Sequence, residues 1–193
     1  MLQSNPKILV FCGSTRGGSV NNRLVGAVSR ELSLLDCDVT RISLADYPLP
    51  LYDGDLEAND GIPENAKKLA HLLNEHDGYF VVSPEYNGSL TPLLKNTIDW
   101  ISRVPSVEDV SPFRGKVAAI GAVSPGGMGG ISMLYHLREI LVRLGTLVVS
   151  EQVAVGNAST AFDENDNVIA ERSADFLKAA CVSLSKKVSL LRA

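Results

Sequence analysis

KILVFCGSTRGGSVNN, residues 7–22, carries the clearest indication of the fold in the sequence. Its first part, Lys7–Cys12, is apolar after the lysine and rich in β-branched residues, as expected of a buried strand. A loop with three glycines follows, and from Val20 onward apolar residues recur with helical spacing. A strand that passes through a glycine-rich loop directly into a helix indicates a β-α unit, and we find the same order repeated along the chain.

Four more apolar segments are predicted as strands: Asp38–Leu44, Gly78–Ser83, Lys116–Val123 and Thr146–Val155. Apolar stripes with helical spacing lie between and after them. These stripes are Val20, Leu24, Ala27, Val28, Leu32 and Leu35; Ala66, Leu69, Ala70 and Leu73; Leu134, Leu137, Leu141 and Leu144; and Leu177, Cys181, Leu184, Val188 and Leu191. The segment Leu90–Arg103 completes the set of helices. Tyr47–Pro63, rich in Pro, Asp and Gly, is predicted as a loop excursion.

Five β-α units predict an α/β fold in which a doubly wound parallel sheet of five strands lies between two helical layers, with right-handed crossovers. The usual strand order at this size is 2-1-3-4-5, that of flavodoxin-like folds, although the pattern does not itself encode the order. Ligands of such sheets bind at the carboxyl ends of the strands, near the switch point between strands 1 and 3. We therefore expect the site in the loops after strands 1, 3 and 4.

The length and the net charge of the chain limit the number of domains and the classes of binding partner. The 193 residues fit one domain, so residues 1–193 are predicted to form a single one. A net charge of -4 argues against a nucleic-acid surface, which needs concentrated Lys and Arg. The early apolar run Ile8–Cys12 is too short for a signal peptide or a membrane span. We expect a small-molecule partner, with no nucleic acid and no membrane.

The three cysteines, Cys12, Cys37 and Cys181, are widely spaced in apolar surroundings. Their number and spacing match neither a disulfide framework nor a metal site, which predicts a cytoplasmic protein without a metal. Cys12 is expected to be a small buried strand residue. The three histidines, His71, His76 and His136, have no partners at metal-binding spacing and are predicted to be surface or helix-face residues.

The loop after the first strand has the composition of a phosphate site. Its glycines let backbone N–H groups turn inward, the following helix N-terminus adds partial positive charge, and Ser14, Ser19 and Asn21 offer hydrogen bonds. Arg16 adds a permanent, forked cation. A nucleotide P-loop is excluded because Ser19 and Val20 stand where Lys and Ser/Thr are required, and G-x-G-x-x-G is absent. The alternative is a tight helix entry with Ser19 as its N-cap.

The loop after the third strand, Ser83–Ser89, reads SPEYNGS. Pro84 and Gly88 impose an irregular backbone whose polar groups suit the edge of a planar heterocycle, and Tyr86 offers a flat face. Taken alone, the same residues make an ordinary turn, and Glu85 is expected to be a solvated or capping carboxylate rather than a catalytic base.

The loop after the fourth strand, Ser124–Gly130, carries four glycines in five positions. Such a run costs backbone entropy and supplies no packing, so it needs a compensating reason. Close approach of a ligand ring is one such reason, and a flexible connection is the alternative.

Together, and in this order, the three segments resemble the NADPH-dependent FMN reductase family, a flavodoxin-like group that includes quinone, azo-dye and chromate reductases. GSTRGGSVN resembles the family's G-S-x-R-x-x-S-x-N phosphate loop, SPEYNGSLTPLLKNTIDW its P-E-Y-N segment and following helix, and SPGGMGG its third flavin loop. The resemblance extends over Lys7 to Leu144. It departs at Thr91-Pro92, where family members often carry Pro-Gly, so access of the nicotinamide and substrate preference do not follow from it.

The resemblance implies FMN as the cofactor and NADPH or NADH as the co-substrate. It places Ser14, Arg16, Ser19, Val20 and Asn21 at the phosphate; Pro84, Glu85, Tyr86, Asn87 and Gly88 at the isoalloxazine and ribityl; and Ser124, Gly126 and Gly127 near the pyrimidine end. We name no catalytic acid or base, because the flavin carries the chemistry. A homodimer or homotetramer is also implied, with the helix Leu93–Arg103 near the interface. Trp100 is then either an interface anchor or an ordinary core residue.

The expected function is electron transfer from NAD(P)H through FMN to a quinone or a similar acceptor, such as a flavin, an azo compound or chromate. One alternative is a non-enzymatic flavodoxin-type carrier, but such carriers have a phosphate loop without arginine, stronger acidity and more aromatic residues. Another is a module that binds a phosphorylated ligand, which leaves the second and third loops without a purpose.

Overall fold

One parallel sheet forms the centre of the molecule and confirms the predicted α/β fold. The computed structural model describes residues 4–105 and 111–192. Five parallel strands pair in the order β2-β1-β3-β4-β5, as predicted. Their bounds are β1 (Lys7–Cys12), β2 (Asp38–Ser43), β3 (Gly78–Val82), β4 (Val117–Val123) and β5 (Leu147–Val155).

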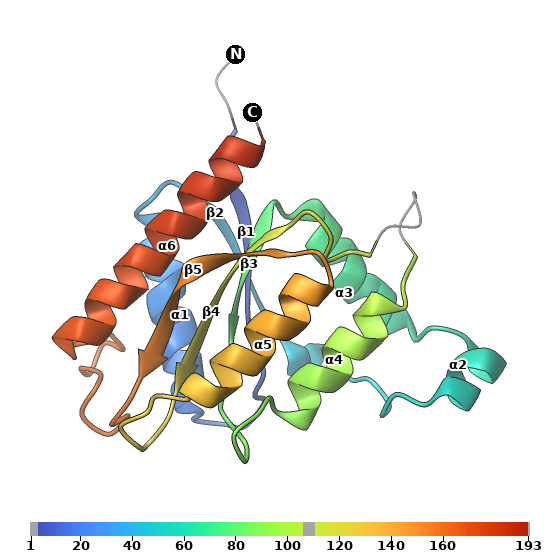
Figure 1. Ribbon diagram of the computed structural model, residues 1–193, viewed down its shortest axis with the longest axis horizontal. Helices are drawn as coiled ribbons and strands as arrows, with labels where there is room; N and C mark the ends of the chain where they lie inside the picture. Colours follow the sequence, from blue (N-terminus) through green and yellow to red (C-terminus); the bar gives the residue numbers. More distant parts are fainter. Residues whose placement is uncertain (1–3, 106–110, 193) are drawn as a thin grey trace.

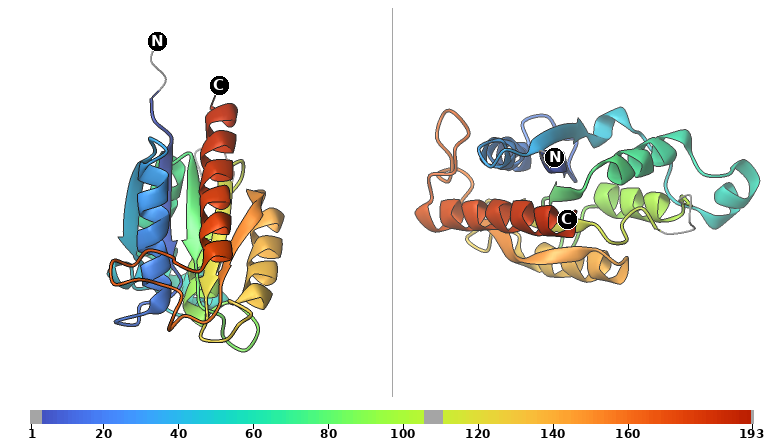
Figure 2. Two further views of the ribbon diagram at one scale, coloured as in Figure 1. Left: turned by 90° about the vertical axis from the view of Figure 1, so that its left-hand side faces the viewer. Right: turned by 90° about the horizontal axis from the view of Figure 1, so that it is seen from above.

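Helices cover both faces of this sheet (Figures 1 and 2). On one face lie α1 (Val20–Ser33) and α6 (Glu171–Leu191). On the other lie α3 (Glu64–Glu75), α4 (Pro92–Ser102) and α5 (Ile131–Arg143). All residues of β3 and β4 are buried, which explains why these segments are apolar throughout.

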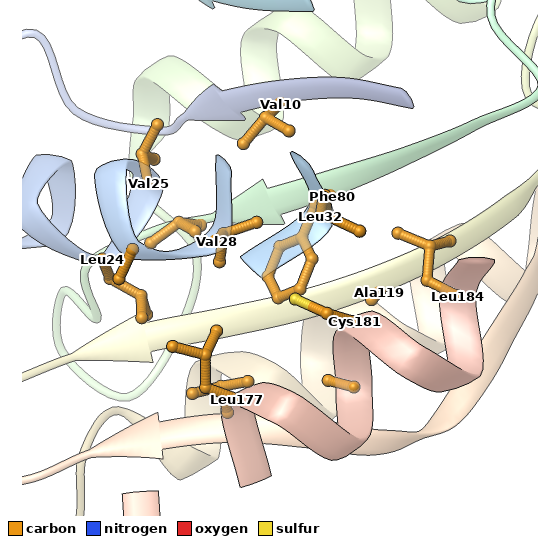
Figure 3. Packing of buried hydrophobic residues seen from close by; sticks show 14 of the residues in the cluster. Val10, Leu24, Val25, Val28, Leu32, Phe80, Ala119, Leu177, Cys181 and Leu184 are labelled. Atoms are coloured by element: carbon orange, nitrogen blue, oxygen red, sulfur yellow. The ribbon is translucent and has the colours of Figure 1, made fainter. Parts of the chain in front are cut away.

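The hydrophobic core is divided by the sheet into two clusters, because successive strand side chains point to opposite faces. In β1, Ile8 and Val10 pack under α1 and α6, whereas Leu9 and Phe11 pack under α3, α4 and α5. Figure 3 shows the first cluster, in which the two helices meet over the sheet through Leu24, Val28, Leu32, Leu177, Cys181 and Leu184. The three cysteines are buried, as expected for Cys12.

Some local predictions differ from the structure. A short 3-10 helix, η1 (Leu44–Asp46), begins where the second strand was predicted to end, and α2 (Gly54–Asp60) lies within the expected loop excursion. None of the residues of α2 is buried, so no apolar stripe marked it in the sequence. The apolar stripe of α6 ends at Val188, because Leu191 is 63% exposed.

His76 is also not the surface residue that the sequence suggested. Only 7% of the residue is exposed, and its Nδ1 lies 2.6 Å from the carbonyl oxygen of Leu72, one helical turn earlier. His71 is exposed near Glu75 on α3. Within residues 4–105 and 111–192, no helix combines the length and the apolar character needed to cross a bilayer.

Trp100 is a core residue within the described chain. Its side chain is fully buried, and its indole N–H donates to the carbonyl of Pro50 at 2.8 Å. The ring of Tyr52 meets it edge-on, with 5.0 Å between the centroids. Trp100 therefore fastens α4 to the segment before α2.

The ends of the described chain and the candidate binding loops lie at opposite ends of the sheet. The described chain begins and ends at the upper side of Figure 1, whereas the strands point toward the opposite side. The three glycine-rich or turn-rich loops after β1, β3 and β4 gather at this lower, carboxyl edge (Figure 1). This is where ligands bind in doubly wound sheets.

Candidate functional site

Backbone hydrogen bonds extend the sheet into the first two loops. The N–H of Gly13 donates to the carbonyl of Val82 at 2.8 Å, and the N–H of Ser83 donates to the carbonyl of Gly121 at 3.0 Å. Gly13 leaves no room for a side chain, since a Cβ there would lie 2.6 Å from Ser83 Oγ. The loop after β1 is therefore held by the end of β3, and the loop after β3 is held by β4.

Thr91 joins the first loop to α4. Its hydroxyl donates to the carbonyl of Gly13 at 2.7 Å and accepts from the N–H of Leu94 at 3.2 Å, which caps the helix. Pro92 occupies the first turn, where a missing N–H costs nothing. The Thr91-Pro92 pair, which departs from the family pattern, thus forms a capped helix entry.

Glu85 caps α5, which is one of the two roles, solvated or capping carboxylate, that the sequence indicated. Its carboxylate accepts from the N–H of Met133, three residues into the helix, at 3.1 Å. Gly130, the N-cap position, has no side chain with which to cap the helix. The second loop is thereby tied to the helix that follows the third loop, and the negative charge complements the positive end of α5.

The glycines of the third loop fall into two kinds. Gly129 and Gly130 have φ angles of +63° and +81°, and a Cβ on Gly129 would lie 2.7 Å from the carbonyl carbon of Ala154. Packing against the sheet explains these two. Gly126 and Gly127 have no atom within 4 Å of where a Cβ would be, so they leave the loop surface open.

A fourth segment, the loop after β5, also takes part, and the sequence reasoning missed it. The N–H of Asn157 donates to the carbonyl of Gly126, and that of Ala158 to the carbonyl of Ser124, both at 3.2 Å. A Cβ on Gly156 would lie 2.5 Å from the carbonyl oxygen of Gly127. The signal was a glycine directly after the fifth strand, which permits this close backbone approach.

Asn21 has a structural use that the sequence did not reveal. Its residue is 2% exposed, its amide nitrogen donates to the carbonyl of Val123 at 3.1 Å, and its amide oxygen accepts from the N–H of Val123 at 2.8 Å. This side chain therefore fastens the start of α1 to the end of β4. Its contact with a phosphate stays a prediction.

The backbone of the first loop presents a set of donors. Within the described chain, the N–H groups of Thr15, Gly17, Gly18, Val20 and Asn21 donate to no protein acceptor. The last two belong to the first turn of α1, which contains no acidic residue. A cluster of such donors at a helix N-terminus suits an anion.

The side chains of the same loop add to this character. Ser19 occupies the N-cap position, as the alternative reading expected, yet its hydroxyl makes no capping bond to α1. Ser14 Oγ accepts only a long hydrogen bond, 3.4 Å, from the N–H of Arg16. Arg16 is exposed, and its guanidinium forms no ion pair within the described residues.

These features fit the FMN that the resemblance implies. The N–H groups and Arg16 suit the phosphate, and the open backbone at Gly126 and Gly127 leaves space for the edge of a ring. Tyr86 is 51% exposed at a tight turn whose central residues, Asn87 and Gly88, both have positive φ. The predicted site residues therefore lie on neighbouring loops of one edge, with Asn21 turned toward β4.

Comparison with known proteins identifies relatives over most of the chain. The chain is 36% identical to a quinone reductase of Escherichia coli over 151 residues, which are 78% of this chain and 77% of that protein. It is 33% identical to an NAD(P)H-dependent FMN reductase of Pseudomonas aeruginosa over 188 residues, covering 96% of this chain and 97% of that one.

Solved structures with a similar fold include flavoproteins. The flavoenzyme NAD(P)H:(acceptor) oxidoreductase of Paracoccus denitrificans superposes with a TM-score of 0.80 at 26% identity, covering 96% of this chain and 98% of that chain. An archaeal flavodoxin, with a TM-score of 0.59 at 13% identity and coverage of 95% and 99%, shares the fold. A model of the family described as NADPH-dependent FMN reductase matches residues 6–160. The chain therefore belongs to the NADPH-dependent FMN reductase family, whose oxidoreductases use FMN and a nicotinamide nucleotide.

Proposed function

We propose that the chain is a single FMN-binding domain over residues 1–193 that transfers electrons from NADPH or NADH to a quinone or a similar acceptor. Flavins, azo compounds and chromate are further acceptors of this class. The redox chemistry comes from bound FMN, which exchanges electrons with a nicotinamide and with an acceptor in turn. The protein's own contribution is binding and orientation.

The observation that carries the proposal is the first loop. It combines N–H donors that have no acceptor within the described chain, the N-terminus of α1, and the guanidinium of Arg16, which forms no ion pair with the residues that the structure describes. A terminal phosphate satisfies all three at once, through charge-assisted hydrogen bonds and the helix dipole. The loop serves as the anchor of the cofactor, whose ring then extends along the sheet edge.

The second and third loops support a ring at a fixed position. Pro84–Gly88 follows β3 and Ser124–Gly127 follows the neighbouring strand β4. The hydrogen bond between Glu85 and Met133 ties the second loop to α5, the helix that follows the third loop. Because the carboxylate of Glu85 is committed to the start of α5, we assign it an orienting role and no proton transfer. A preorganised ring needs no side-chain acid or base for hydride transfer.

We further propose that the protein is a cytoplasmic homodimer or homotetramer. Support for assembly comes from exposed apolar side chains around a hollow of about 710 Å³ along the edge strand β5, which α5 and α6 flank from opposite faces of the sheet. These side chains are Met128, Tyr135 and Phe176, which are 71%, 61% and 43% exposed. Support for the cytoplasm comes from the three buried cysteines, which are free thiols.

The test is spectroscopic. Purified protein is expected to be yellow, anaerobic NADPH or NADH should bleach the flavin absorbance, and a quinone added afterwards should restore it. A colourless protein that takes up no added FMN would refute the proposal. A yellow protein that neither nucleotide reduces would instead point to the electron carrier.

A further inference from the structure

A polar hollow lies next to the first loop, between the start of α1 and the end of β2. Its volume is about 400 Å³, and its polar lining consists of Ser14, Asn22, Arg41, Ser43 and Asp46. Apart from Ser14, the proposed FMN site uses none of these residues. The hollow therefore offers a second polar binding region next to the proposed FMN phosphate site.

Arg41 supplies the positive charge of this hollow. It is exposed, and within the described residues it takes part in no ion pair. A Cβ on Gly26 of α1 would lie 4.0 Å from Arg41 Nη1 and 3.6 Å from Arg30 Nη1, so both guanidinium groups approach the same point of the helix. Arg30 is already engaged, because its Nη2 donates to the carbonyl of Asp166 at 2.6 Å. Arg41 is therefore the arginine that the lining of the hollow offers to an anion.

The other lining groups complete the chemistry. Ser14, Ser43 and Asn22 offer hydroxyl and amide donors. Burial raises the pKa of Cys12, which also lines the hollow, to about 11, so its thiol carries no charge near neutral pH. Asp46 is the opposing group, since it is the carboxylate among the lining residues. Arginine with several neutral donors suits a phosphate, and Asp46 weakens its binding.

The position of the hollow indicates which phosphate. It lies at the carboxyl ends of β1 and β2, whereas the proposed ring site follows β3 and β4. With adjacent strands about 4.8 Å apart, two to three strand spacings separate the regions by roughly 10–15 Å. A dinucleotide whose nicotinamide meets the flavin ring has two riboses and a pyrophosphate with which to span this distance.

We propose that this hollow binds the 2′-phosphate of NADPH through Arg41, and that Arg41 therefore makes the protein prefer NADPH over NADH. The inference rests on the proposed function. In dinucleotide sites of other parallel sheets, an acidic side chain binds the 2′-hydroxyl of NAD, and an arginine accommodates the 2′-phosphate of NADP. Here Arg41 reads the phosphate, and Asp46 moderates its affinity.

A binding experiment without turnover tests the site. Calorimetric titration of the FMN-loaded protein should show that 2′,5′-ADP binds at least tenfold more tightly than 5′-AMP, which lacks the 2′-phosphate. Arg41→Gln should weaken 2′,5′-ADP about ten- to a hundredfold, because it removes charge-assisted hydrogen bonds. Asp46→Asn should tighten it. The matched control, Arg143→Gln at the end of α5, removes the same charge at the opposite edge and should change neither ligand.

Kinetics give the second readout. Arg41→Gln should raise KM for NADPH about ten- to a hundredfold and leave KM for NADH and the FMN content unchanged. The inference would be overturned if Arg41→Gln changed KM for NADPH and NADH equally, lowered the FMN content, or had no effect. It would also be overturned if Asp46→Asn weakened the binding of NADH. Because 2′,5′-ADP binding needs no electron transfer, failure of the proposed function is distinguishable from failure of this site.

Discussion

The guanidinium of Arg16 is the charge on which the proposed phosphate site depends. Arg16→Ala should weaken FMN binding about ten- to a hundredfold, since it removes hydrogen bonds to a charged group worth roughly 1.5–3 kcal/mol. Titrating apoprotein with FMN and following flavin fluorescence measures this. Arg16→Lys should keep part of the affinity, because the charge remains while the forked geometry is lost. Unchanged affinity in the alanine variant would contradict the role.

The two kinds of glycine in the third loop predict two kinds of variant. Gly129→Ala should lower the free energy of unfolding by about 1–3 kcal/mol, because φ is +63° and backbone atoms lie 2.7–3.0 Å from the new Cβ. Gly126→Ala has open space around it, so its stability should stay within about 1 kcal/mol of wild type while FMN binding weakens. Urea denaturation of the apoproteins compares the pair, and equal destabilisation would refute the distinction.

The side-chain amide of Asn21 holds α1 against β4. Asn21→Ala should lower the free energy of unfolding by about 1–3 kcal/mol, because the N–H and carbonyl of Val123 lose their partner in a buried environment. Denaturation of the apoprotein measures the loss. Asn22→Ala is the neighbouring control, since this side chain is half-buried and bonds to no group within the described chain. Similar stabilities for the two variants would contradict the bridging role.

Hydrogen bonds between elements also explain why the site edge keeps its shape. Thr91 links the first loop to α4, Glu85 links the second loop to α5, and Asn157 links the loop after β5 to Gly126. Each bond joins segments that are distant in the chain. The loops are thus held by the elements behind them, as a preorganised cofactor site requires.

The exposed apolar side chains around the hollow of about 710 Å³ predict that the protein assembles with further copies of itself. Tyr135→Glu should lower the molar mass of the particle measured by light scattering after gel filtration, because it places a charge in an apolar contact. Leu34→Glu, which replaces a residue that is 78% exposed at the end of α1, is the control and should keep the wild-type mass. A wild-type monomer, or an unchanged mass for Tyr135→Glu, would refute this interface.

Most of the fold was predictable because its signals are local. The five strands were placed to within one residue at each end, since apolar runs and glycine-rich loops mark them directly. The helix α2 was missed because it is stabilised by capping at Asp53 rather than by burial. His76 was misplaced because its burial depends on the end of α3 meeting the sheet, which periodicity within the helix does not report.

The candidate site divides in the same way. The loops that carry phosphate-binding and ring-binding residue types could be named from the sequence alone, because glycines, hydroxyls and arginine indicate their chemistry locally. Which of these groups are already engaged, as Asn21 and Glu85 are, depends on contacts between distant segments of the folded chain. The same contacts place Arg41 and Ser14 in the lining of one hollow. These contacts follow from the topology of the sheet. β2 lies beside β1 only after the chain has crossed over through α1, so a contact between such distant segments exists only once the sheet has formed.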